Sequence, residues 1–178
     1  DPADLQSYLD ARGEALQRAF AGSADKEASY LAISGGGQYG AFGAGVLNAW
    51  SETGERPEFF GVSGISTGAL IAPFAFLGPE YDDVLEDIYT TSRTEDLLVP
   101  TLFSGVLRGA GLADTSGLAA KIAQYVTADF LAEVAAEHRR GRALLVGTTN
   151  IDAQRPVIWD MGAIAASGHP DALELSRD

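Results

Sequence analysis

Apolar residues in the first 20 positions recur at intervals of three and four, which is the spacing of one helical face. The residues on this face are Leu5, Tyr8, Leu9, Leu16 and Phe20. From residue 21 the stretch AGSADKEAS replaces them with small and polar residues. We therefore expect a leading helix followed by a linker, together occupying residues 1–27.

Two strand-turn-helix units follow the linker. Residues 30–34, YLAIS, form a short apolar run that ends in three glycines, and apolar residues then continue at helical spacing through 41–50. Residues 58–65 and 67–76 repeat this order around Ser66. Strands that alternate with helices in this way favour a parallel sheet, so we predict an α/β fold.

The rest of the chain predicts further helices and a pair of strands. The expected helices cover 81–88, 117–126 with Asp114 or Thr115 as its cap, and 130–140, and the expected strands are 142–151 and 156–160. Pro73 should remove one hydrogen bond from the helix after Ser66 and kink it. Residues 91–113 show no periodic pattern.

Composition limits the classes of function. A chain of 178 residues fits a single domain that needs no disulfides, and it has no cysteine. Its net charge of −13 repels polyphosphate, so nucleic acid is not an expected partner. The longest apolar run, 68–78, is about half of the ~20 residues that span a bilayer. The first residue is Asp1 rather than Met, which favours a processed cell-envelope or secreted protein and leaves the compartment undecided.

The stretch GISTG, residues 64–68, places Ser66 between two glycines at the expected strand-to-helix turn. A serine on such a bend projects its hydroxyl from the sheet, and Gly64 and Gly68 avoid side-chain clashes there. The preceding glycine turn, Gly35 to Gly37, presents backbone N–H groups that can hold the negative oxygen of a tetrahedral intermediate. Because neighbouring parallel strands end at the same edge, we expect both turns to form one catalytic site.

Two other interpretations compete with this site. Both turns can be packing turns in which glycine allows a close approach of helix and strand. Dinucleotide binding is the second, because Gly35, Gly37 and Gly40 also satisfy G-x-G-x-x-G. That function needs an acidic residue at the end of the second strand, where this chain has GIS. We rank both below the catalytic interpretation.

The strings SGGGQYG and GISTG resemble the patatin-like phospholipase family, which combines a G-G-G-x-[RK]-G oxyanion loop with a G-x-S-x-G elbow. The resemblance covers about residues 28–165 and implies a parallel sheet sandwiched by helices on both faces. It also implies a serine esterase acting on acyl-lipid or phospholipid substrates, in transient contact with a membrane surface, through a Ser-Asp dyad without metal or cofactor. Ser66 matches the nucleophile, and Gly35, Gly36 and Gly37 match the oxyanion loop.

The sequence departs from this family at two points. Tyr39 stands where the family usually has Arg or Lys, and no aspartate of the chain is followed by glycine, as the family's D-G-[GA] motif requires. We therefore expect one truncated domain over 1–178, incomplete at its C-terminus, with the catalytic aspartate beyond Asp178. Asp160 is interpreted as a strand-end or helix-capping residue.

Two alternative functions remain open from the sequence. Ser66, Asp160 and His169 follow the chain order of an α/β-hydrolase triad, although Asp160 and His169 are close together in sequence. A scaffold that lacks its base can also serve as a non-catalytic module that binds lipid or a partner.

Overall fold

The computed structural model describes residues 2–20, 28–90 and 116–177. The leading helix is confirmed as α1, Pro2–Phe20. Residues 21–27, most of the expected linker, lie outside the described residues, and so do residues 91–115, which include Asp114 and Thr115.

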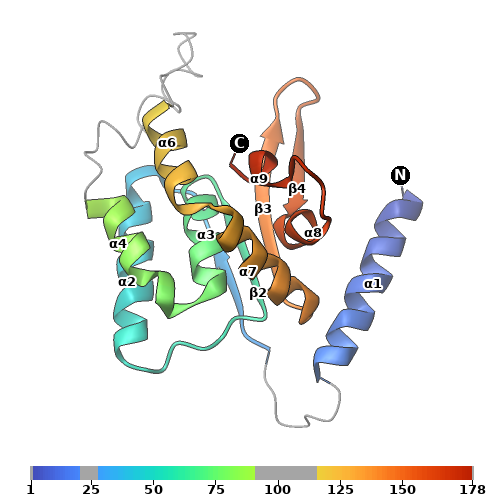
Figure 1. Cartoon of the computed structure of the whole chain (residues 1–178), viewed down its shortest axis with the longest axis horizontal. Coiled ribbons are helices and arrows are strands. Elements are labelled where there is room, and N and C mark those ends of the chain that lie inside the picture. Colours follow the sequence, from blue (N-terminus) through green and yellow to red (C-terminus); the bar gives the residue numbers. More distant parts are fainter. Residues whose placement is uncertain (1, 21–27, 91–115, 178) are drawn as a thin grey trace.

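A four-stranded sheet in the order β1-β2-β3-β4 forms the centre of the molecule (Figure 1). Its strands are β1 Tyr30–Ile33, β2 Gly61–Ile65, β3 Ala143–Asn150 and β4 Arg155–Asp160. β1, β2 and β3 are parallel, and β4 returns antiparallel to β3 as the second half of a hairpin. The structure confirms the expected α/β class with a mostly parallel sheet and the expected strand pair.

Helices connect and cover the strands. They are α2 Gly40–Glu52, α3 Thr67–Leu77, α4 Asp82–Thr90, α6 Ser116–Tyr125, α7 Ala128–Arg139, α8 Met161–Ala166 and α9 Ala172–Leu175. α3 continues through Pro73 as one helix. Thr127 caps α7 by accepting a hydrogen bond from the Phe130 amide at 3.2 Å. Among the described residues, no helix is long and apolar enough to span a bilayer.

The hydrophobic core lies on one face of the sheet, where alternate strand residues such as Val62 and Leu144 meet α3, α4 and α7. On the opposite face Tyr30, Ile65 and Ile158 are exposed. α1 is tied to the strands and the adjoining turn by two long-range hydrogen bonds: Tyr8 donates to Asp160, and Arg12 donates to the carbonyl of Gly141. The core therefore fixes the positions of the two turns that precede α2 and α3.

A buried arginine joins three parts of this core. Arg142, 5% exposed, donates to the carbonyls of Phe59 and Phe76 and stacks over the Phe76 ring. It also forms an ion pair with Glu137 at 2.9 Å. Burial alone would raise the pKa of Glu137, but the hydrogen bonds from Arg142 and Arg140 outweigh it and hold the pKa below its usual value.

We predict that Glu137→Gln destabilises the protein by about 1.5 kcal/mol at pH 7, because a charge-assisted hydrogen bond to Arg142 becomes neutral. A carboxylate with a lowered folded pKa stabilises the fold above its unfolded pKa, and this contribution is lost as the pH falls through the folded value. The difference in unfolding free energy between wild type and variant should therefore shrink below about pH 4. Urea titrations at pH 7 and pH 3 measure it, and a difference that is independent of pH would contradict the prediction.

Candidate active site

Ser66 occupies the turn between β2 and α3 with a left-handed backbone, at φ 57° and ψ −125°. This region is costly for a residue with a side chain, and such strain is concentrated at functional turns. The Ser66 side chain is exposed, and its hydroxyl makes no hydrogen bond within the described part of the chain. The local geometry is therefore that of a sharp strand-to-helix turn that presents its serine outward.

The two glycines around Ser66 are required by close backbone contacts. A Cβ atom at Gly64 would lie 2.1 Å from the carbonyl oxygen of Gly68, and one at Gly68 would lie 2.2 Å from that of Ile33. Both distances are far below any tolerated contact. The absence of these side chains lets the start of α3 pack directly against the ends of β1 and β2.

The glycine turn after β1 lies against Ser66. A Cβ atom at Gly35 would be 2.9 Å from the Ser66 Cβ and 3.5 Å from its Oγ. Gly37 has a left-handed φ of 58° and begins a single 3₁₀ turn, Gly37–Tyr39, before α2. No turn or loop hydrogen bond between described residues uses the N–H groups of Gly35, Gly36 or Gly37. The structure thus brings Gly35 of the first predicted turn against Ser66 of the second.

Gly40, at the start of α2, is buried between the two turns and α4. A Cβ atom there would lie 2.7 Å from the Tyr89 hydroxyl and 3.1 Å from the Thr67 Cβ. Burial raises the pKa of Tyr89 to about 12, so its phenol is neutral at pH 7. Gly40 therefore sets the spacing between the start of α2 and the start of α3, while Tyr39 before it is exposed.

Asp160 caps α8, as the sequence predicted, by accepting a hydrogen bond from the Ala163 amide at 2.9 Å. It also accepts one from Tyr8, and burial together with this bond raises the Tyr8 pKa to about 12. His138 lies 3.7 Å from the Asp160 carboxylate, but burial lowers its pKa and favours the neutral imidazole. These contacts give Asp160 structural partners.

The strand register separates Asp160 from Ser66. Ile65, Gly147 and Ile158 are paired across β2, β3 and β4, whereas Asp160 pairs with Leu145, further from the edge that carries Ser66. Because adjacent strands lie about 4.8 Å apart, Asp160 is about 10 Å from β2 across the sheet. His169 is exposed, and its Nδ1 accepts a hydrogen bond from the Asp171 amide. The structure does not assemble Ser66, Asp160 and His169.

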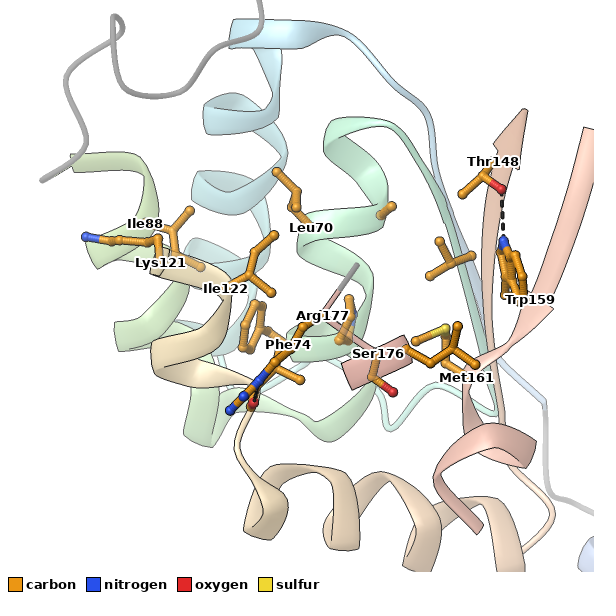
Figure 2. Close-up of a pocket in the computed structure, with 15 residues that line it drawn as sticks. Leu70, Phe74, Ile88, Lys121, Ile122, Thr148, Trp159, Met161, Ser176 and Arg177 are labelled. Atoms are coloured by element: carbon orange, nitrogen blue, oxygen red, sulfur yellow. Dashed lines mark hydrogen bonds between the residues drawn. The ribbon is translucent and has the colours of Figure 1, made fainter. Parts of the chain in front are cut away.

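An apolar pocket of about 440 Å³ opens along α3, starting one helical turn after Ser66 (Figure 2). Ala69, Leu70 and Pro73 line one side, and Val146 with Trp159 lines the other. The Trp159 indole donates to the Thr148 hydroxyl at 2.8 Å, which holds the ring at the pocket wall. Within the described residues, no group of three or more His, Cys, Asp or Glu side chains could hold a metal ion.

Sequence reasoning missed this pocket because its wall comes from α3, α4, α6, α8, α9 and two strands, which are distant in sequence. The sequence also did not predict which side of α2 is buried, because the apolar residues of this helix lie on more than one face. The structure buries Gly40, Ala44 and Leu47 and leaves Phe42, Val46 and Trp50 exposed. The available signal was the small size of Gly40 and Ala44, two of the three buried residues, because small side chains let a helix pack closely against its neighbours.

The parallel sheet and its two adjoining strand-turn-helix units define an α/β protein whose candidate site lies at the carboxyl edge of the strands. The sequence model of the patatin-like phospholipase family matches residues 31–170. The chain belongs to this family, which confirms the predicted resemblance and supports a lipid acyl hydrolase at the level of the family. No curated protein and no solved structure matches the chain.

Proposed function

We propose that Ser66 is the nucleophile of a serine lipid acyl hydrolase and that Gly35, Gly36 and Gly37 form its oxyanion hole. The observation that carries this proposal is the contact of Gly35 with the Ser66 side chain in a left-handed turn. One oxyanion donor lowers a barrier by about 2.7–4 kcal/mol, so a loop of free N–H groups beside the serine favours acyl transfer.

The reaction follows from these positions. Ser66 Oγ loses its proton to a base and attacks the acyl carbonyl carbon, and the negative oxygen is held by the glycine amides. The bond to the alcohol breaks, the alcohol takes up the proton, and water then releases the fatty acid from the serine. The base in this proposal is the aspartate of a Ser-Asp dyad. Among the described residues, no carboxylate makes a hydrogen bond with the Ser66 hydroxyl.

The pocket along α3 suits the acyl chain of such a substrate. Ala69 and Leu70 follow Ser66 by three and four positions, which places them on the same side of the helix. Thr148, one residue after the Gly147 that pairs with Ile65, brings the opposite wall to the same edge. An ester held at Ser66 would therefore have an apolar surface directly beside it.

A fluorophosphonate probe tests the nucleophile. In the whole protein, the probe should label Ser66, and peptide mapping should find the adduct on the peptide that contains GISTG. Labelling at any other serine, or none at all, would reject the assignment. Absence of labelling would favour a non-catalytic module that binds lipid or a partner, an alternative supported by the exposed Tyr39 in place of a cation.

The alternative triad makes a separate prediction. In the whole protein, His169→Ala should change kcat/KM on a p-nitrophenyl ester less than about threefold, because its imidazole is exposed and, among the described residues, its partners are the amide and carboxylate of Asp171. His138→Ala is a comparison variant, since that imidazole is packed against Gly162 and its loss should lower the melting temperature. A loss of about 10³-fold or more in the His169 variant would instead indicate the Ser66, Asp160 and His169 triad.

A further inference from the structure

The outward side of α2 and the turn before it carry a row of exposed apolar side chains. Its members are Tyr39, Phe42, Val46 and Trp50, which are 73%, 75%, 46% and 36% exposed. Their spacing of three, four and four residues places them along one side of the helix. We call this row the α2 apolar face. The opposite side of α2 is buried and carries Gly40, Ala44 and Leu47.

This face is unusual for a helix in contact with water. A solvated helix side normally carries charged and polar residues, yet α2 has no charged residue before Glu52. The contrast is sharp because the chain has 37 charged residues, 25 acidic and 12 basic. Exposed apolar rows that interrupt a charged surface mark sites of interaction.

The position of the face relates it to the candidate site. Tyr39 ends the 3₁₀ turn that begins at Gly37, so the row starts at the proposed oxyanion loop and runs away from it along α2. In Figure 1, α2 lies on the side of the molecule opposite α1. A surface that docks on this face would lie beside the opening at Ser66.

The chemistry of the face selects one occupant. Tyr and Trp favour the boundary between lipid and water, because each combines an apolar ring with a polar atom. The face offers no Lys or Arg to anionic headgroups, and the net charge of −13 opposes them. Neutral or zwitterionic lipid has neither of these disadvantages.

We propose that the α2 apolar face docks the protein onto the surface of neutral or zwitterionic lipid, with Phe42 and Val46 inserted. This inference rests on the proposed function, since an acyl hydrolase with its site at this edge must meet aggregated lipid. Docking would place the ester bonds of the surface at the mouth of the site, and the pocket along α3 would receive the extracted chain.

Binding to phosphatidylcholine vesicles tests the proposal without requiring catalysis. The whole protein carrying Ser66→Ala leaves the vesicles intact, and Phe42→Glu or Val46→Glu is added to it. Each should weaken co-sedimentation about tenfold or more, because an inserted apolar side chain is replaced by a charge. Leu9→Glu on α1, which is 51% exposed, is the matched control and should change binding less than twofold. Thermal melting checks that every variant is folded.

Several results would overturn the docking proposal. Equal losses in the Leu9 and Phe42 variants would show a non-specific charge effect, and unchanged binding in both α2 variants would exclude the face. Stronger binding of the parent protein to phosphatidylglycerol vesicles would contradict the lipid class. The oligomeric state is a further readout. If the parent protein is a dimer and the α2 variants are monomers that still bind vesicles, the face would be assigned to contact with a second copy of the chain. Because binding is measured without turnover, failure of the nucleophile assignment would be recognised separately.

Discussion

Ser66→Ala should lower ester hydrolysis by the whole protein about 10⁴-fold or more while the protein remains folded. The substitution removes one exposed oxygen that makes no hydrogen bond within the described residues, so it withdraws the nucleophile without leaving a buried group unpaired. Alanine keeps a Cβ atom and therefore the strained backbone at φ 57°, so neither local strain nor packing against Gly35 should change. Initial rates on a p-nitrophenyl ester, with thermal melting of the same samples, measure both parts.

Ser63→Ala is the matched control for this experiment. Ser63 lies three residues earlier, inside β2, and pairs with Ala32 and Leu145 in regular strand geometry. Its loss should leave turnover within about twofold, because a residue in the strand interior cannot reach the carboxyl edge where the turns meet. Substantial turnover by Ser66→Ala, or an equal loss in both variants, would refute the nucleophile assignment.

The elements that carry the candidate site were predictable because their signals are local. A short apolar run followed by glycines and helical periodicity predicted β1 with α2 and β2 with α3, and the structure has both units. The pairing of the two turns followed from a general property of parallel sheets, since adjacent strands end at one edge. The cap at Asp160 was also readable, from its position between a strand and the residues of α8.

Other features depend on partners that are distant in sequence. Arg142 is the first residue of the expected strand 142–151, and its burial was not predicted, because the carbonyls that accept its hydrogen bonds are 83 and 66 residues away. Tyr8 and Asp160 are 152 residues apart and still bond to each other. The exposure of one side of α2 was not predictable for a related reason. Periodicity predicts that an apolar row exists, but it does not show whether neighbouring elements cover that row.

Gly68→Ala should cause the largest loss of stability among these predictions, and activity should be lost with it. The added methyl would meet the Ile33 carbonyl oxygen at 2.2 Å and its carbonyl carbon at 2.8 Å. These are backbone atoms at the end of β1, so no side-chain rotation relieves the clash, and α3 must move away from the sheet. Overpacking of this kind costs about 3 kcal/mol or more, a large part of the stability of a typical domain.

Gly45→Ala separates this clash from the general effect of replacing glycine. Gly45 lies within α2, and a Cβ atom there would meet nothing within 4 Å. Because alanine is a better helix former than glycine, this control should gain about 0.5–1 kcal/mol. Urea unfolding of the two variants compares the sites directly. A stability loss below about 1 kcal/mol in Gly68→Ala would show that α3 does not need its close approach to β1, and that the elbow glycines tolerate a side chain.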